Sequence, residues 1–346
     1  MTDSNETDAF DNEGTGVLPD WMFQAFMPSY YGIVCASGLL GNGVVIFVLL
    51  RCKDSKSGVP NVYILNLASA DFLFLIGLPF LGHFNSTGGW IFGDFLCQIV
   101  MGIDGMNMFT GIFTLTAMSI DRYVAIVHPV WSKRCRTVKR AWTVCLLMWI
   151  LSGVSSVPLW QYAQTQTFDN VTVCNIVCSK SIRQFFVAYA FIVGFIIPLT
   201  TISAAYLNIV HFLVAGRSRP HRRIPIGRVG KMILFAVVVF VICWLPFWVT
   251  QLAMALTRSQ TRTRAMKITY FCATFLTYAN SCLNPIIYTY LRRDFQRQVI
   301  DLFRRGVKSS PKTAAKRHPK LIRGSHSNSL THKTPVPTQI RMSISN

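Results

Sequence analysis

Residues 229–256, which read VGKMILFAVVVFVICWLPFWVTQLAMAL, decide the fold class. Their apolar side chains form an almost continuous run instead of a stripe at helical spacing. The run also exceeds the roughly 20 residues that a helix needs to cross a bilayer. Six other segments share both properties: 29–50, 62–84, 95–126, 141–162, 184–214 and 267–291. We therefore predict an all-α membrane protein built as a seven-transmembrane helix bundle.

Prolines interrupt several of these segments, at Pro79, Pro158, Pro198, Pro246 and Pro285. A soluble helix rarely tolerates an internal proline, because the ring removes a backbone hydrogen bond and clashes with the preceding turn. Membrane helices tolerate it because neighbouring helices and polar side chains satisfy the freed backbone groups. The prolines thus favour a lipid environment over a large soluble core.

The distribution of basic residues predicts the orientation, since cytoplasmic loops collect Lys and Arg. The first 28 residues contain neither and carry six acids, whereas the loops after the first, third and fifth segments and the chain after the seventh are basic. We predict a multi-pass plasma-membrane protein with its N-terminus outside and its C-terminus in the cytosol. The net charge of +20 then faces anionic lipid and cytosolic partners, not nucleic acid.

One loop departs from this rule, because the predicted outer loop before the seventh segment is also basic, with Arg258, Arg262, Arg264 and Lys267. These charges either steer a ligand, or meet the acidic N-terminal tail, or form an ordinary solvated loop. The charges at the other span boundaries all favour the predicted orientation, so this loop does not change it.

The chain outside the bundle divides into three parts. Residues 1–28 form a predicted extracellular tail without a cleavable signal peptide, so that the first span acts as its own insertion signal. Residues 292–305 carry apolar side chains at helical spacing among basic ones, which predicts a short amphipathic eighth helix on the inner membrane surface after the bundle at 29–291. Residues 306–346 are polar and predict a disordered tail, with candidate phosphorylation sites at Ser325, Ser327, Ser329 and Thr331.

The predicted outer segments carry two further signals. Glycosylation sequons begin at Asn5, Asn85 and Asn170. Three cysteines also fall outside, where an oxidising compartment permits a disulfide between two of them: Cys97, Cys174 and Cys178.

Short motifs within the spans point to one family. They read GLLGNGVV at 38–45, LNLASAD at 65–71, SIDRYVAIVHP at 119–129, FVICWLPF at 240–247 and SCLNPIIY at 281–288, with Trp149 in the fourth span. In order and spacing this set resembles the rhodopsin-like G-protein-coupled receptors over residues 29–305. No nucleophile, metal-ligand or phosphate-loop pattern indicates an enzyme.

The resemblance implies how such a chain would be activated. Asp121 and Arg122 match the family's cytoplasmic switch, and Tyr206 and Tyr288 match two tyrosines that move toward that arginine when a G-protein binds. Trp244 resembles the residue that transmits ligand contact to the sixth span. No acid near residues 221–231 could restrain Arg122, so we expect Asp121 to restrain it.

The resemblance also implies a polar pocket at mid-membrane depth. Asp71, Asn107, Asn280 and Asn284 match the positions that hold an allosteric sodium ion in the family; no other cofactor is expected. Gly111 stands where the family usually has a serine ligand. Because hard cations need several oxygen ligands, a hydrated Asp71 without sodium is the alternative.

Asp104 is the candidate ligand anchor. It lies eighteen residues before Arg122, about five helical turns from the cytoplasmic boundary, and ionisable groups inside a bilayer are usually functional. In the family this position pairs with a cationic ligand group, and the resemblance adds Tyr278, Gln251 and Trp244 as neighbours. The alternative is a structural role for Asp104, tied only to Tyr278.

Two cations compete as the partner of Asp104: a small amine and the guanidinium of a peptide arginine. Ala190, Phe191 and Gly194 replace the serines of catecholamine receptors, and Phe275 replaces a tryptophan of amine receptors. A pairing of Cys97 with Cys174, as found across the family, fits the peptide reading, although Cys178 is an alternative partner.

Finer patterning over Val59–Phe80, GGWIFGDFLC at 88–97 and DGMNMFTGIF at 104–113 resembles the melanin-concentrating hormone receptors, with somatostatin and opioid receptors as near relatives. This implies a receptor for a cyclic neuropeptide, most of all melanin-concentrating hormone, that signals through Gi/o with Gq as a second route. The partners implied are a peptide hormone, a heterotrimeric G-protein, arrestin, receptor kinases and membrane lipid. A somatostatin- or opioid-type receptor is the nearer alternative, and a non-signalling scavenger or a retinal protein the more distant one.

Overall fold

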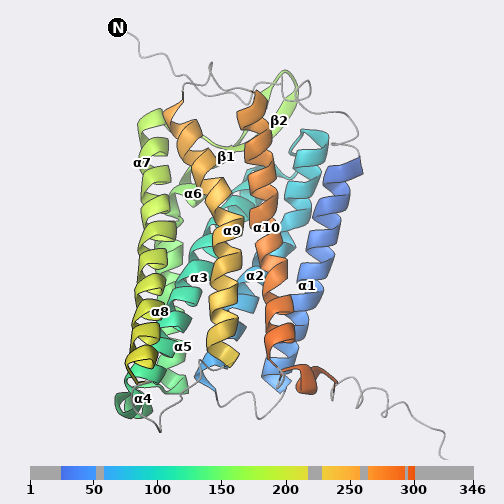
Figure 1. Ribbon diagram of the computed structural model, residues 1–346. Coiled ribbons are helices and arrows are strands. Elements are labelled where there is room, and N and C mark those ends of the chain that lie inside the picture. The colour runs from blue at the N-terminus through green and yellow to red at the C-terminus, as the bar shows by residue number, and fades with distance from the viewer. Residues whose placement is uncertain (1–24, 52–57, 217–227, 258–263, 293–294, 301–346) are drawn as a thin grey trace, which may run out of the picture. The chain divides into compact units, whose positions relative to one another are not determined.

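The computed structural model describes residues 25–51, 58–216, 228–257, 264–292 and 295–300. These residues build the long helices of Figure 1 within the compact unit Met1–Arg304. The first three spans are α1 (Met27–Arg51), α2 (Val59–Thr87) and α3 (Gly93–Val127), and the last two are α9 (Arg228–Leu256) and α10 (Arg264–Leu291). The fourth span is α5 (Val138–Ser155) followed by α6 (Val157–Tyr162), and the fifth comprises α7 (Lys180–Phe191), the π-helical turn η4 (Ile192–Ile196) and α8 (Ile197–Gly216).

Six of these spans, all but α10, are long and apolar enough to cross a membrane. Helix α10 is 28 residues long and more polar, and it packs against both α9 and α1 in the same bundle. The predicted seven-helix bundle is therefore confirmed.

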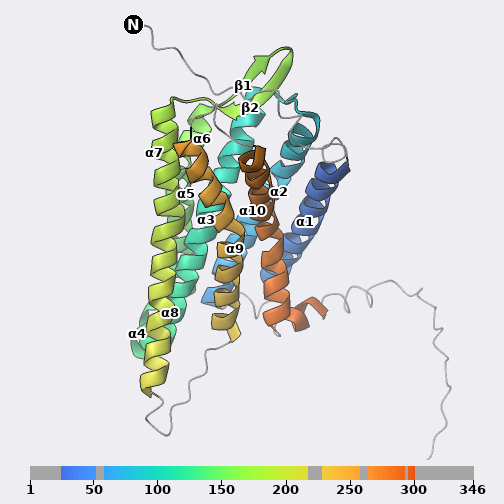
Figure 2. The ribbon, with the colours of Figure 1, turned by 45° about the horizontal axis from the view of Figure 1, so that its top comes forward.

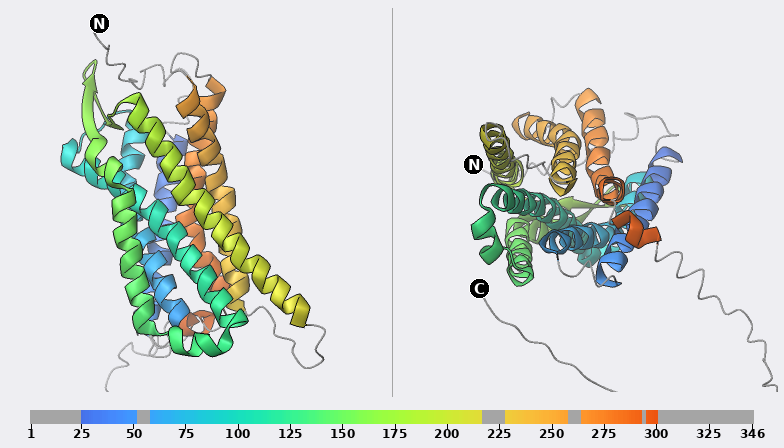
Figure 3. Two further views of the ribbon diagram at one scale, coloured as in Figure 1. Left: turned by 90° about the vertical axis from the view of Figure 1, so that its left-hand side faces the viewer. Right: turned by 60° about the horizontal axis from the view of Figure 1, so that its bottom comes forward.

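Helix α3 occupies the centre of the bundle. It packs against α2, α5, α6, α8 and α9, while α1 and α10, far apart in the sequence, lie side by side (Figure 3). The outward faces expose large apolar side chains, among them Ile33, Leu40, Leu146 and Ile242, which are 60–71 % accessible. Such a surface suits contact with lipid tails.

Two antiparallel strands, β1 (Ala163–Phe168) and β2 (Val171–Ile176), form a hairpin at one end of the bundle (Figure 2). We call this the hairpin end and the other the far end. Phe168 pairs with Val171, and the two turn residues, Asp169 and Asn170, both have positive φ. A two-residue turn of this kind matches the twist of the flanking strands.

The predicted span 141–162 is not a single helix. It starts earlier, at Val138, because the side chain of Thr137 accepts a hydrogen bond from the Arg140 amide. It breaks at Ser156, since Pro158 in the first turn of α6 cannot continue the backbone ladder of α5. In the fifth span the η4 turn comes directly before the turn that contains Pro198.

The far end carries a short helix, α4 (Pro129–Cys135), between α3 and α5. Residues 295–300 are also helical; Phe295 is buried and Ile300 is half exposed, as expected for the start of an amphipathic helix. Leu302, Phe303 and the predicted tail at 306–346 lie outside the described residues, and the predicted boundaries of the four chain parts stay predictions.

Candidate functional site

The carboxylate of Asp104 lies half-buried in the part of α3 nearer the hairpin. Within the described part of the chain, no hydrogen bond or ion pair to another residue engages it. The side chains of Tyr31, Tyr270 and Tyr278 lie close enough to interact with it electrostatically. The described part of the bundle thus places the Asp104 carboxyl group among aromatic side chains and supplies no cation to it.

Tyr278 belongs to an aromatic cluster at the hairpin end and is not bonded to Asp104. Its ring packs against those of Tyr31 and Phe74, at centroid distances of 5.8 and 5.6 Å. Phe275 joins the cluster next to Tyr30, whose hydroxyl donates to the Phe275 carbonyl. The hydrogen bond from Tyr278 that would give Asp104 a purely structural role is therefore absent among the described residues.

Trp244 lies among other aromatic side chains of α9. It stacks on Phe240 and meets the edge of Phe247, both at 5.6 Å, and its buried indole nitrogen has no hydrogen-bond partner in the described chain. Gln251 lies further along α9 and is half-buried. Trp248, which the sequence did not single out, packs against Phe191 and is only 2 % exposed.

The disulfide pairs Cys97 with Cys174, as the family resemblance implied, and Cys178 is free. Two sets of hydrogen bonds also connect the hairpin to the segment around the start of α3. The carboxylate of Asp94 accepts hydrogen bonds of 2.6 Å from the backbone and hydroxyl of Thr165. The Trp90 amide donates to the Thr172 carbonyl, also at 2.6 Å. Sequence reasoning missed Asp94, because nothing local to it announces a partner in a hairpin about 70 residues away.

The predicted sodium pocket is partly assembled. Asn284 donates to Asp71 at 2.8 Å, and Asn107 donates to the hydroxyl of Ser281 at 3.3 Å, which leaves the buried Asn107 Oδ1 without a partner among the described residues. Asn280 is half-buried and forms none of these hydrogen bonds within the described part of the chain. Asp71, Asn107 and Ser281 therefore offer oxygen ligands that fit a hard cation, while Gly111 offers none.

Asp121 at the far end is doubly paired. Arg122 donates to it at 2.6 Å. Arg136, directly after α4, donates two bonds to the same carboxylate, at 2.7 and 2.8 Å. The expected pairing of Asp121 with Arg122 is present, but the bidentate partner is Arg136, which the sequence showed only as one of several basic loop residues.

The two predicted switch tyrosines differ in their contacts. The hydroxyl of Tyr206 donates to the carbonyl of Gly230 in the first turn of α9, at 2.9 Å, and thus joins α8 to α9. Tyr288 is 1 % exposed, and its hydroxyl has no partner within the described residues. Neither donates a hydrogen bond to Arg122 or accepts one from it among the described residues, but Tyr206 lies close enough to Arg122 to interact with it electrostatically.

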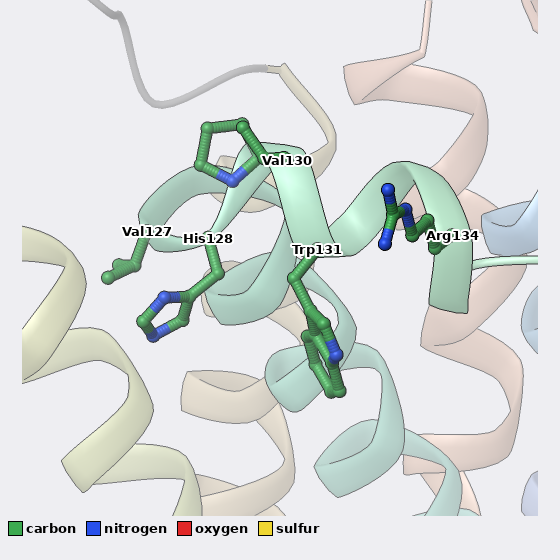
Figure 4. A pocket seen from close by; sticks show the side chains of 6 residues that line it. Val127, His128, Val130, Trp131 and Arg134 are labelled. Carbon is green, nitrogen blue, oxygen red and sulfur yellow. The ribbon is translucent and has the colours of Figure 1, made fainter.

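A shallow hollow of about 470 Å³ lies at the corner between α3 and α4 (Figure 4). Asp104 lies about 35 Å away along α3, from the helical rise, so the two belong to different sites. The hollow's surface is apolar, with Val130 78 % and Trp131 57 % exposed. Its lining comprises Val127, His128, Pro129, Val130, Trp131 and Arg134.

The two described sequons differ in accessibility. Asn170 is exposed in the hairpin turn. Asn85 lies in the last turns of α2, where its side-chain nitrogen donates to the Tyr31 hydroxyl and the Leu81 carbonyl, at 3.0 and 2.8 Å. Since a glycan is attached through that nitrogen, these bonds compete with modification of Asn85. Asn5 lies outside the described residues.

Comparison with known proteins agrees with this arrangement. The family model described as 7 transmembrane receptor (rhodopsin family) matches residues 41–288, so the chain belongs to the rhodopsin family of seven-transmembrane receptors. It is similar to somatostatin receptor type 5 of Rattus norvegicus, with 41 % identity over 280 residues that cover 78 % of this chain and 75 % of the receptor.

It is also similar to somatostatin receptor type 2 of Mus musculus, with 38 % identity over 285 residues, covering 80 % of this chain and 77 % of that receptor. Somatostatin receptor type 1 of Rattus norvegicus is 37 % identical over 308 residues, covering 85 % and 76 %. The predicted family is confirmed. These relatives favour the somatostatin-type alternative, and the prediction of melanin-concentrating hormone as the ligand gains no support from them.

Proposed function

We propose that this chain is a plasma-membrane receptor for a cationic peptide of the somatostatin type, with the hairpin end outside the cell. The observation that carries the proposal is the unpartnered carboxylate of Asp104 inside the bundle. A charge in a site of low polarity is costly unless it is paired. A ligand cation supplies the missing partner, and the pair is strong because it forms away from bulk water.

The neighbouring residues support a peptide more than a small amine. The hairpin borders the same end and is tied to α3 by the disulfide, so a large ligand meets it on entry. The fifth span offers Ala190, Phe191 and Gly194 where a catechol would need hydroxyl groups. Gln251 and the aromatic rings along α9 complete the proposed binding surface.

Binding is proposed to reach the far end through Trp244 and α9. Pro246 lies two residues after Trp244 in α9 and supplies a flexible point, because its ring removes a backbone hydrogen bond. Movement of α9 would break the bond between Tyr206 and Gly230, and Arg122 would leave Asp121 to meet a G-protein. The exposed apolar corner at Val130 and Trp131 offers a docking surface beside it.

The remaining partners are proposed from the family. Arrestin and receptor kinases would act on Ser325, Ser327, Ser329 and Thr331, which lie outside the described residues. A sodium ion at Asp71 would be held through Asn107, Ser281 and the carboxylate, and would favour the resting arrangement.

Glycosylation is proposed at Asn170 in preference to Asn85. Asn170→Gln is expected to increase the gel mobility of the untreated receptor, and peptide N-glycosidase should abolish the difference between this variant and the parent. Asn85→Gln should migrate as the parent does. A mobility change with Asn85→Gln alone would contradict the assignment.

The central experiment is a panel of peptides applied to cells that express the chain, with inhibition of cAMP formation and calcium release as readouts. Somatostatin is expected to inhibit cAMP formation, while melanin-concentrating hormone and opioid peptides are inactive. A response to melanin-concentrating hormone without one to somatostatin would overturn the proposed ligand class. Saturable uptake of somatostatin with neither signal would favour a scavenger.

A further inference from the structure

Two glycines flank the proposed ligand anchor on α3. Gly102 and Gly105 are one helical turn apart and share a face, and Asp104 projects about 130° away from the middle of that face. Each glycine lowers the stability of a helix relative to alanine, because its backbone loses more conformational freedom on folding. Both are buried, and the space they leave is filled.

Side chains of α6 fill that space. A methyl group at Gly102 would overlap the indole of Trp160, and one at Gly105 would overlap the side chain of Leu159 and lie 3.3 Å from Ser156 Cβ. The indole nitrogen of Trp160 donates to the Ser156 hydroxyl at 3.2 Å. Helix α6 therefore packs directly onto the bare backbone of α3, on the side facing away from Asp104.

The other end of α6 is also held. It continues into β1, and the Tyr162 carbonyl accepts a hydrogen bond of 2.8 Å from Val177 just after β2. The hairpin is fixed to α3 by the disulfide and by Asp94. Helix α6 is thus fixed between the hairpin and the two glycines and has little freedom to move relative to α3.

We propose that Leu159 and Trp160 are positioning residues for the ligand-binding carboxylate. By packing against Gly105 and Gly102 they fix the position of the α3 backbone next to Asp104. The carboxylate is therefore already in place when the cation of the ligand arrives. Preorganisation of this kind strengthens binding because the ligand does not have to order the site. The inference rests on the proposed function, in which Asp104 binds a cationic peptide.

A mutant cycle between Gly105 and Leu159 tests the inference. Gly105→Ala is expected to weaken binding of radiolabelled somatostatin about tenfold, because overpacking displaces α3. Combining it with Leu159→Ala removes the overlap and should restore affinity to within about threefold of the parent. Gly153→Ala in α5 is the matched control, since it gives the same gain in helix propensity with no atom within 4 Å of the new methyl group.

A second readout separates positioning from a general structural effect. Somatostatin with acetylated amino groups lacks their positive charges, so its affinity, measured by competition, should be the same in Gly105→Ala as in the parent. Equal losses for both peptides, an unchanged affinity in Gly105→Ala, or no recovery in the double variant would overturn the inference.

Asp104→Asn distinguishes this inference from the proposed function. A loss of somatostatin binding in Asp104→Asn with none in Gly105→Ala refutes the positioning role alone. Full binding by Asp104→Asn refutes the proposed anchor and the positioning role with it, as does an absence of somatostatin binding by the unsubstituted receptor.

Discussion

The two ends of α3 treat their carboxylates in opposite ways. Asp104, toward the hairpin, has no partner within the described chain, whereas Asp121 at the far end accepts bonds from both Arg122 and Arg136. Asp71 is intermediate: Asn284 donates to it at 2.8 Å, and the side chains of Ser281 and Asn107 also lie within hydrogen-bonding reach of its carboxylate. A carboxylate without a partner in the protein is available to a ligand cation, whereas a carboxylate with two arginine partners is already neutralised by the protein. The difference separates where a ligand is received from where the resting state is secured.

Removing the unpaired charge is expected to have the largest effect. Asp104→Asn keeps the shape of the side chain but removes its charge, so somatostatin affinity should fall about 30- to 150-fold, from the roughly 2–3 kcal/mol that a desolvated ion pair loses with one partner. Saturation binding measures this, with surface expression followed in parallel.

Asp169→Asn in the hairpin turn is the matched control, because it makes the same change at an exposed position that tolerates asparagine. If Asp104→Asn instead reached the surface poorly and bound normally where present, Asp104 would be a structural residue and the contrast between the two ends would disappear.

Releasing the paired charge should have a smaller effect of a different kind. Arg136→Ala removes two bonds to Asp121, and loss of about 1–1.4 kcal/mol from the resting state would raise the ratio of active to resting receptor about five- to tenfold. Basal inhibition of cAMP formation without peptide measures this ratio. Lys133→Ala, an exposed basic residue of α4, should change nothing. Unaltered basal activity in Arg136→Ala would show that Arg136 does not secure the resting state.

A substitution can add a ligand group near Asp71, the carboxylate with intermediate pairing. Gly111 has room for a side chain, since only Leu67 Cδ1, at 3.9 Å, lies near a Cβ placed there. Gly111→Ser adds a hydroxyl ligand one turn from Asn107, so sodium chloride should lower agonist affinity about fivefold more than in the parent, at the low end of usual coupling energies. Choline chloride at the same concentration controls for ionic strength. Equal sodium effects in both proteins would mean that the added hydroxyl does not reach an ion at Asp71.

The smallest expected effect concerns the bond between α8 and α9. Tyr206→Phe removes one neutral hydrogen bond to Gly230, so basal signalling should rise about threefold, corresponding to roughly 0.6 kcal/mol. The maximal response to agonist should fall as well, because the hydroxyl is then absent from the active state. Tyr290→Phe, on the outside of α10, is the control. A fall in basal signalling would show that this bond does not hold the resting state.

The fold could be predicted from the sequence because membrane thickness sets the length of an apolar run. The helix ends could not, since hydropathy reports the lipid-facing length and not the helix itself. Helix α7, the first part of the fifth span, begins at Lys180 instead of residue 184. The Ser179 side chain caps it by accepting a hydrogen bond from the Ile182 amide. The break at Ser156 could not be placed from the sequence, because residues 141–162 are long enough for one span and Pro158 is the only proline among them.

The candidate site could be predicted only where a motif marked it. Asp104, Arg122 and the pairing of Cys97 with Cys174 followed from the family resemblance. Arg136, Asp94 and the packing of Leu159 on Gly105 did not, because each depends on a partner distant in sequence and leaves no local pattern. A basic loop residue that pairs with Asp121 looks the same in sequence as one that faces water.

The hairpin turn at Asp169 and Asn170 offers a practical handle on the receptor. Its residues are exposed, and the strands behind it are held at their base by the disulfide, Asp94 and Trp90. Exposed turns anchored in this way accept inserted sequence well. A short epitope placed between the two turn residues should therefore report the number of receptors on living cells while leaving somatostatin binding intact.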